Sequence, residues 1–353
     1  MKRYKFQSST FPYLGSKMQQ SSTLASFINP KKHKVLVSPF AGGCSFELYA
    51  KLRLSMRIVS NDWSLISFVS QKALLENNHI RIEPNDVYSL FKENKNSGFV
   101  KKNYSRFFIE HVCDFLDTAS ENIRQMPEGT KKHLLSHLVV FYVIHLLPYG
   151  KFGCTLDVKN IKEKGLNGAI EGAMTSESRL RKFILSTNHP LPVLKKLAER
   201  VNNGIVNNNQ ENLVFSEDVF DFLPKTRKFS DEAVLFADPP YFQSCSYNIY
   251  DSMSEILVGE KIEKNNSVFN SREVEMWFDR FFEECQHLGL WLITYGGKID
   301  NPEALHSAKF LEMVKKHRPK AKLLKLENYT WSINSLSGKS PRECEEYIII
   351  AEK

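Results

Sequence analysis

A carboxylate and two prolines follow an apolar run in the second half of the chain. The run Ala233–Phe236 predicts a buried strand, and Ala237, Asp238, Pro239, Pro240 and Tyr241 come directly after it. Two prolines remove two backbone donors and fix the shape of the loop, which leaves mainly acceptors. Ligands of open α/β sheets bind outside the carboxyl ends of the strands. We therefore expect this loop to accept the hydrogens of an amine.

The exocyclic N6 of adenine is an amine of this kind. Its lone pair is conjugated with the ring, and acceptors placed on its two hydrogens favour the pyramidal, nucleophilic nitrogen. Tyr241 could then stack on the base. A plain Pro-Pro turn with a solvated aspartate shows the same residues, so the loop alone leaves both interpretations open.

A glycine-bearing turn marks a second candidate site. It runs from Pro39 to Ser45 and contains Gly42 and Gly43, and it joins the predicted strand Val35–Val37 to an apolar helix over Phe46–Leu54. A strand, a tight turn and a helix let the backbone approach a nucleotide at the helix N-terminus. A pair of glycines is also common in turns that bind nothing.

Two further acids follow predicted strands. Asp62 ends the strand Arg57–Ser60, about 20 residues beyond the glycines, where an acid would meet ribose hydroxyls; an ordinary cap or turn is an equal alternative. Asp218 follows the strand Leu213–Phe215, which we expect to neighbour the strand before Asp238. The two acids would then serve a cofactor adenine and a substrate amine.

The composition describes a globular chain with a large core. Of its 353 residues, 42% are hydrophobic and 25% charged, and a net charge of +8 favours a polyanionic partner. The six cysteines form no C-x-x-C pair, which predicts reduced thiols and no zinc site. His133 and His137 lack the glutamate of an H-E-x-x-H motif and are expected to be core or face histidines, so we expect no metal.

The sequence predicts a soluble, cytoplasmic protein with no membrane contact. No apolar segment follows the basic N-terminus, and the apolar run Leu138–Leu147 is interrupted by His145 and is too short to span a bilayer.

The middle of the chain predicts an inserted helical domain. Amphipathic segments with interleaved basic and aromatic residues replace the strands between Leu65 and about Asn209. We place the boundaries at residues 1–68, 69–205 and 206–353, the first and last being the two parts of an α/β catalytic domain. The basic residues of the insertion either contact phosphates or form a solvated face. The loop with Tyr149 and Lys151 is expected to face the partner.

The C-terminal part continues the α/β pattern. Gln243–Asn266 is polar and is predicted to be a mobile loop, and Asn270 with Glu273 predicts a capping box before a helix. The remaining predicted elements are the strand Leu290–Thr294, the helix Phe310–His317 and the strand Glu346–Ala351.

Taken together, the motifs resemble the Dam-like (D12 class) N6-adenine-specific DNA methyltransferases over nearly the whole chain. The segment Tyr13–Lys17 resembles the aromatic-x-Gly-Gly-Lys motif of that family, Pro39–Gly42 its P-F-x-G cofactor loop, and Asp238–Tyr241 its catalytic motif. The resemblance implies a Rossmann-like, S-adenosylmethionine-dependent sheet with an inserted target-recognition domain. It also implies a bacterial or phage-encoded enzyme that methylates N6 of adenine in double-stranded DNA.

The resemblance implies a role for each matching residue. Lys17 would pair with the cofactor carboxylate, Asp62 with the ribose, and Asp218 with the cofactor adenine. The target adenine would flip out, stack on Tyr241 and present N6 to Asp238 and the Pro239 carbonyl. The full set is Asp238, Pro239, Pro240 and Tyr241 for catalysis; Tyr13, Lys17, Phe40, Ala41, Gly42, Gly43, Cys44, Ser45, Asp62 and Asp218 for the cofactor; and Tyr149 and Lys151 for DNA.

Three positions depart from the family pattern. Ser16 and Cys44 stand where the family has glycines, and Ser38 stands where it commonly has an acid. Cys44 would place a side chain beside the cofactor. An RNA adenine methyltransferase with the same pocket, or a nucleic-acid-binding relative that has lost cofactor binding, stays open as an alternative.

Overall fold

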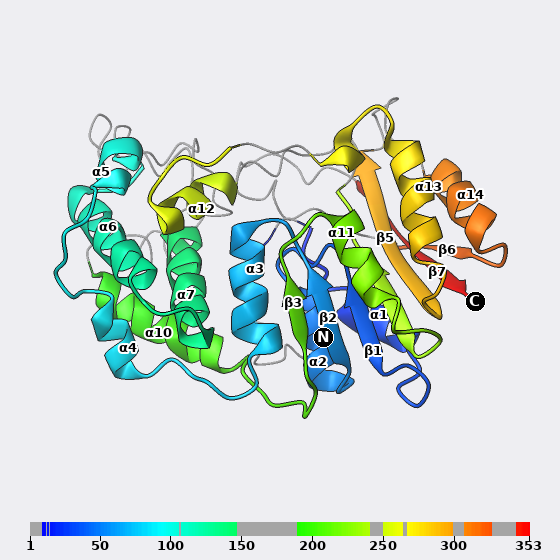
Figure 1. Ribbon diagram of the computed structural model, residues 1–353, viewed down its shortest axis with the longest axis horizontal. Helices are drawn as coiled ribbons and strands as arrows, with labels where there is room; N and C mark the ends of the chain where they lie inside the picture. Colours follow the sequence, from blue (N-terminus) through cyan, green and yellow to red (C-terminus); the bar gives the residue numbers. More distant parts are fainter. Residues whose placement is uncertain are drawn as a thin grey trace.

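The computed structural model describes residues 9–11, 13, 15–105, 107–146, 189–240, 250–263, 267–298, 307–326 and 344–353. A seven-stranded sheet with the order β3-β2-β1-β4-β5-β7-β6 forms one half of the molecule (Figure 1). The strands are β1 Val35–Ser38, β2 Arg57–Asn61, β3 Leu213–Phe215, β4 Ala233–Ala237, β5 Leu290–Lys298, β6 Lys322–Lys325 and β7 Cys344–Glu352. Neighbours from β3 to β5 pair in parallel, whereas β7 runs antiparallel between β5 and β6. This mostly parallel sheet confirms the α/β class.

The strand order corrects one prediction. The strands before Asp218 and Asp238, β3 and β4, are not neighbours, because β2 and β1 lie between them. The chain runs outward from β1 to β2 and β3 and then returns to the other side of β1 with β4. A parallel sheet binds ligands where the strand order reverses in this way, which here is the carboxyl end of β1 and β4.

Both faces of the sheet are covered, which explains why its strands are apolar without alternation. Leu36, Ile58 and Val234 point into one hydrophobic cluster, and the residues next to them on the same strands, such as Val37 and Leu235, point into the other. The first cluster includes residues of α1 (Ser21–Ser26), α2 (Ser45–Arg53) and α3 (Leu65–Gln71). The second includes residues of α11 (Val219–Phe222), α13 (Val274–Glu284) and α14 (Ser307–His317).

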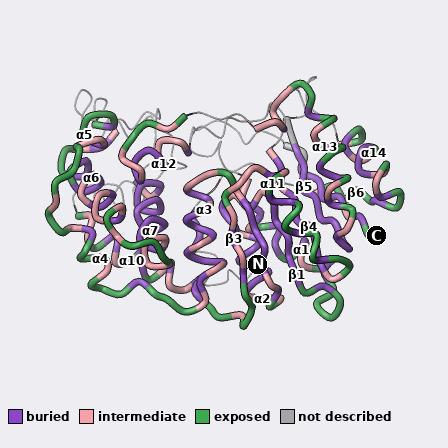
Figure 2. The backbone as a smooth tube through the Cα atoms, in the orientation of Figure 1, coloured by how far each residue is buried: buried purple, intermediate pink, exposed green. Residues whose placement is uncertain are grey.

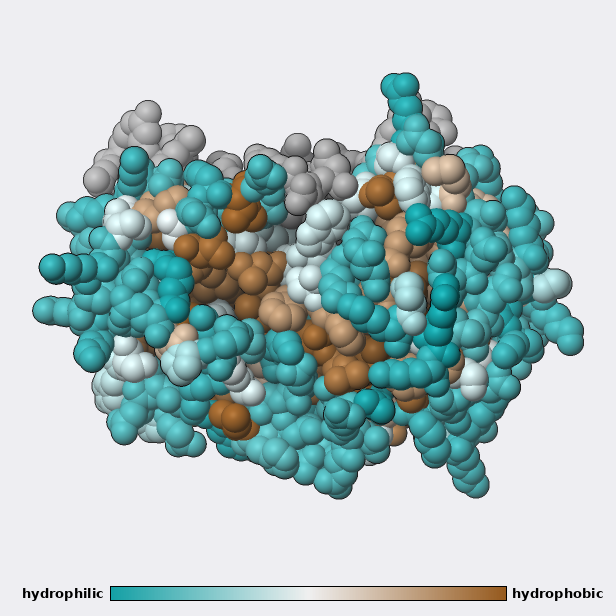
Figure 3. All heavy atoms as spheres, viewed as in Figure 1, coloured by the Kyte–Doolittle hydropathy of each residue, from teal (hydrophilic) through white to brown (hydrophobic). Residues whose placement is uncertain are grey.

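The other half of the molecule is helical (Figure 1). It contains α4 Pro84–Ser89, α5 Phe99–Tyr104, α6 Glu110–Arg124, α7 Thr130–Leu146 and α10 Pro190–Asn202. Helix α7 is buried along almost its whole length (Figure 2) and is the centre of this half. Its side chains belong to the same hydrophobic cluster as the α2 and α3 face of the sheet. On the face shown in Figure 3, apolar residues gather in the hollow between the two halves.

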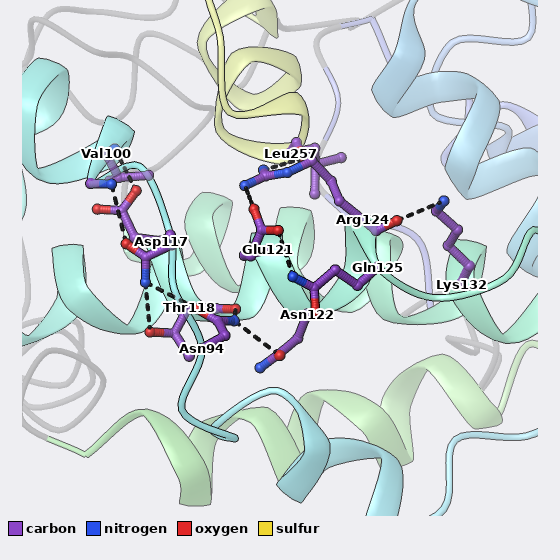
Figure 4. A network of polar contacts seen from close by, with 12 residues as sticks. Asn94, Val100, Asp117, Thr118, Glu121, Asn122, Arg124, Gln125, Lys132 and Leu257 are labelled. Atoms are coloured by element: carbon purple, nitrogen blue, oxygen red, sulfur yellow. Dashed lines mark hydrogen bonds and ion pairs between the residues drawn. The ribbon is translucent and has the colours of Figure 1, made fainter.

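A helix replaces part of the loop predicted over Gln243–Asn266. Helix α12 spans Asp251–Val258 and buries Met253, Ile256 and Leu257, whose spacing puts them on one face. It packs on α6 and α7, and Arg124 of α6 donates a hydrogen bond of 3.0 Å to the Leu257 carbonyl (Figure 4). The segment that follows the D-P-P-Y motif is therefore attached to the helical half.

Two smaller corrections concern the C-terminal part. The capping box predicted at Asn270 and Glu273 is absent: α13 starts after Glu273, whose side chain makes no cap. Ser267 instead caps a short 3₁₀ turn, Val268–Asn270. The strand β6 was not predicted, because its residues Lys322–Lys325 are mostly exposed at the sheet edge and lack an apolar pattern.

No helix within the described ranges is both long enough and apolar enough to cross a membrane.

Candidate active site

A cavity of about 820 Å³ lies at the carboxyl ends of β1, β2, β3 and β4. This volume is within the roughly 300–1,000 Å³ of small-molecule sites. The cavity brings together predicted residues from separate parts of the chain: Tyr13, Lys17, Phe40, Ala41, Gly42, Gly43, Ser45, Asp62, Asp218, Asp238 and Pro240. Pro239 is buried. Tyr241, Tyr149 and Lys151 lie outside the described residues.

Cys44 does not line the cavity, which corrects its predicted place beside the cofactor. It is the N-cap residue of α2 and has a left-handed backbone, with φ of 50°. This conformation directs the side chain into the core, where it is fully buried. Burial raises the pKa of the thiol well above its ordinary value, so the group stays neutral. The departure from glycine therefore costs backbone strain of about 1 kcal/mol and leaves the ligand space open.

The two glycines of the turn make room for an aromatic ring. A Cβ on Gly42 would come within 2.9 Å of Cε1 of Tyr13, and a Cβ on Gly43 within 2.6 Å of the Tyr13 Cβ. Gly42 also has a positive φ of 49°. Tyr13 stacks in turn on Tyr250, with ring centroids 4.6 Å apart. The turn, Tyr13 and the residue before α12 thus form one wall of the cavity.

Asp62 holds the glycine turn in place. Its Oδ2 accepts a hydrogen bond of 2.7 Å from the Gly42 amide, and its Oδ1 accepts one of 2.9 Å from the Ser64 amide. Burial raises the pKa of the carboxyl. Asp62 therefore stabilises the turn, which was one of its two possible roles, and its side chain also lines the cavity.

Asp218, like Asp62, both holds the backbone and lines the cavity. It is the N-cap residue of α11, and its Oδ1 accepts a hydrogen bond of 2.9 Å from the Phe220 amide. It lines the cavity beyond the end of β3. Phe40 packs edge-on against Phe269 at 5.3 Å, which supplies an apolar wall between the ends of β1 and α13.

Lys17 lies among acidic side chains at the carboxyl end of β4. Its Nζ lies 2.8 Å from Oδ2 of Asp238 and 3.0 Å from Oε1 of Glu346 in β7, and it donates to the Gly15 carbonyl at 2.8 Å. The Lys17 and Glu346 side chains are only 3% and 1% exposed. Thr294 of β5 donates a hydrogen bond of 2.8 Å to the other carboxylate oxygen of Asp238. Strands β5 and β7 therefore fix the aspartate that ends β4.

Glu47 is a cavity residue that the sequence did not indicate. It lies in the first turn of α2 and is 1% exposed, yet it lines the cavity. Ser38, at the end of β1, donates a hydrogen bond of 2.6 Å to its Oε1. Burial, with Asp238 and Asp62 nearby, raises the pKa of Glu47 to about 8. An acid between Phe46 and Leu48, inside a buried helix, was the available signal.

His137 is a core histidine, as predicted. Its ring nitrogens lie 2.9 Å from Ser70 Oγ and 3.1 Å from the Ser9 carbonyl oxygen, and burial lowers its pKa to about 4. It therefore joins the N-terminal segment to α3 and α7 as a neutral group.

Comparison with known proteins relates part of the chain to DNA methyltransferases. Residues 13–152 match the family model of the D12 class N6 adenine-specific DNA methyltransferases, a span that includes the glycine turn and Asp62. The chain is also 26% identical over 290 residues to the type II methyltransferase M2.HphI of Haemophilus parahaemolyticus, which covers 80% of this chain and 82% of that protein. Over residues 13–152 the chain is therefore similar to the D12 class N6 adenine-specific DNA methyltransferases.

Proposed function

We propose that the cavity binds S-adenosylmethionine and that the chain methylates an adenine flipped out of double-stranded DNA. The family implies a DNA substrate and an N6 product. One observation carries the proposal: the turn of the cofactor motif, the strand-end acids and Asp238 line the same cavity. By its likeness to a type II methyltransferase, we further propose that the chain is one of this type.

The residues present fit this cofactor. Asp62 faces the cavity at the end of β2, where it is suited to ribose hydroxyls, and Asp218 with Phe40 and Phe269 forms a partly apolar end suited to adenine. Trp63, the residue after Asp62, is 53% exposed and also lines the cavity. Bound S-adenosylmethionine would supply a methyl group made electrophilic by its sulfonium.

On the substrate side, Asp238 and the Pro239 carbonyl would accept the two N6 hydrogens of the target base. Flipping the base costs roughly a few kcal/mol, which stacking on Tyr241 would offset. Thr294 and Lys17 hold both oxygens of Asp238. The contribution of the protein is then mainly positioning and a fixed arrangement of charges.

Lys17 acts, in this proposal, on Asp238 and not on the cofactor carboxylate. Its ammonium lies between two carboxylates of the protein, at 2.8 and 3.0 Å. We therefore assign it as a positioning residue.

Replacing Asp62 by alanine should weaken cofactor binding by about 1–3 kcal/mol, because it removes charge-assisted hydrogen bonds to the ribose and frees the Gly42 amide. Calorimetry with S-adenosylmethionine measures the effect. Asp62→Asn is the matched control: it keeps one carbonyl acceptor for the turn and should lose less. Unchanged affinity in Asp62→Ala would reduce Asp62 to a turn residue.

The inserted segment 69–205 should determine which DNA is bound. Lys151→Ala is expected to raise the KM for DNA or to relax sequence choice, with cofactor affinity unchanged. A phosphate contact would make the salt dependence of binding shallower by roughly one unit of slope, and a base contact would change the preferred site at constant slope. If neither quantity changes, the recognition role belongs to another part of the insertion.

The proposed function is tested by incubating the protein with S-adenosylmethionine and either duplex DNA or RNA. N6-methyladenine in the duplex, detected by mass spectrometry, supports the proposal. Methylation of RNA alone would show that RNA, and not DNA, is the substrate. Absence of cofactor binding in calorimetry would overturn the proposed cofactor.

A further inference from the structure

We propose that Glu47 binds the ammonium group in the methionine part of S-adenosylmethionine, an assignment that rests on the proposed cofactor. Glu47 follows the glycine turn in the first turn of α2 and lines the cavity beside Phe46. It belongs to none of the motifs that assign the other cofactor residues.

The carboxyl group of Glu47 is held firmly in one place. Ser38, the last residue of β1, donates to its Oε1 at 2.6 Å, so the group lies where β1 and α2 meet. The partner is a neutral hydroxyl. The neighbouring acids are engaged differently: Asp62 accepts from backbone amides, and Asp238 is paired with Lys17. Among these three acids, Glu47 thus has only the Ser38 hydroxyl and its own backbone amide as side-chain partners, and no cation.

The charges around Glu47 favour a cationic ligand. Burial raises the pKa of Glu47 most, and Asp238 after β4 and Asp62 after β2 raise it further. Lys51, on the same helix, donates to the carbonyls of Leu74 and Asn77. The Cys44 thiol is neutral. An ammonium beside Glu47 would be attracted to Asp62 and to Asp238, whose charge Lys17 partly compensates, and an anion would be repelled by the same two aspartates.

The position of Glu47 selects the amino-acid end of the cofactor. The acids beyond β2 and β3, Asp62 and Asp218, are assigned to ribose and adenine, which places the nucleoside on that side. The methyl group must lie toward Asp238 at the end of β4. The methionine end is therefore left for the space between β1 and β4, where Glu47 and Lys17 line the cavity.

Binding should then release a proton. With its pKa at about 8, the Glu47 carboxyl is mostly protonated near pH 7 when the ligand is absent. An ammonium placed beside it favours the carboxylate. The proton leaves to solvent, and the carboxylate accepts a charge-assisted hydrogen bond from the ligand.

The test compares two ligands by calorimetry, neither of which can transfer a methyl group to DNA. S-adenosylhomocysteine carries the ammonium, and 5′-methylthioadenosine lacks the whole amino-acid part. Glu47→Gln, which keeps the shape and the acceptor for Ser38, should weaken S-adenosylhomocysteine binding by roughly 10- to 100-fold and change 5′-methylthioadenosine binding by no more than about twofold. Titrations at pH 7 in buffers of different ionisation enthalpy should show proton release in the wild type and none in Glu47→Gln.

Ser38→Ala is the second variant, because it keeps the carboxyl group. It should bind S-adenosylhomocysteine a few-fold more weakly and still release the proton. Proton release by Ser38→Ala tests the assignment even if Glu47→Gln fails to fold.

Three results would overturn the assignment of Glu47. Equal losses for the two ligands would show that Glu47 only shapes the turn, and unchanged S-adenosylhomocysteine binding would show no contact. Absence of proton release in both the wild type and Ser38→Ala would show that Glu47 does not change its charge. Failure of the wild type to bind either ligand is a separate outcome, because it overturns the proposed cofactor and this assignment with it.

Discussion

Asp238→Ala should abolish methyl transfer to DNA while leaving cofactor affinity within about threefold of the wild type. The carboxylate is assigned to the N6 hydrogens of the target adenine, an interaction that matters most as the nitrogen attacks. Removing one such fixed group costs roughly 10²–10³-fold in rate, and loss of the charge that Lys17 faces adds to this. Transfer to a duplex oligonucleotide at saturating S-adenosylmethionine measures the rate, and calorimetry measures the affinity.

Asp238→Asn is the matched control for the charge. It keeps the size of the side chain and an oxygen that can accept from Thr294, but it cannot form the ion pair with Lys17. We expect it to lose most of the rate. Substantial turnover in Asp238→Ala would end the assignment, and an equal loss of cofactor affinity would move Asp238 to the cofactor side.

The sequence was sufficient to predict the strands that form the cavity, because strands buried on both faces have continuous apolar runs. The predicted strands Val35–Val37, Arg57–Ser60 and Ala233–Phe236 are all present, each one residue longer at its carboxyl end. The order of the strands was not predictable in the same way. Position along the chain suggested that β3 and β4 are neighbours, whereas β2 and β1 separate them. Only the pairing of strands in three dimensions decides this.

Site residues could be predicted where a motif fixes the backbone conformation. They were harder to predict where the outcome depends on the orientation of a side chain. The glycine turn, Asp62 and Asp238 line one cavity, as the motifs implied. Cys44 was misplaced because its left-handed backbone turns the side chain into the core. Glu346 lies in an apolar strand. The sequence shows that an acid is present there, but it does not show that Lys17 is its partner.

Helix α12 was also not predicted from the sequence. Its apolar residues Met253, Ile256 and Leu257 have helical spacing, but polar neighbours on both sides suggested a loop. The helix forms because these side chains have α6 and α7 to pack on. Packing of this kind contributes about 25 cal/mol per Å² of apolar surface that leaves water. The sequence of the segment alone does not show that such a partner exists.

Lys17→Met should lower the free energy of unfolding by about 3–5 kcal/mol and should also slow methyl transfer. The substitution leaves Glu346, which is 1% exposed, without the ammonium that compensates its buried charge. Breaking a buried ion pair by removing one partner costs this much because the remaining charge stays desolvated. Asp238 is 21% exposed and can recover part of its hydration, so most of the loss should come from Glu346. Urea unfolding followed by circular dichroism measures the change.

The double variant Lys17→Met with Glu346→Gln separates this explanation from a simple loss of packing. Replacing Glu346 by glutamine removes the buried charge, so the double variant should be more stable than the sum of the single losses predicts, by about 1–3 kcal/mol. Additive losses would contradict an ion pair that stabilises the fold. Ligand binding decides the role of Lys17 in function: a residue that positions Asp238 lowers kcat and leaves S-adenosylhomocysteine affinity unchanged. A partner of the cofactor carboxylate would instead weaken S-adenosylhomocysteine and spare 5′-methylthioadenosine, and that result would restore the role implied by the family resemblance.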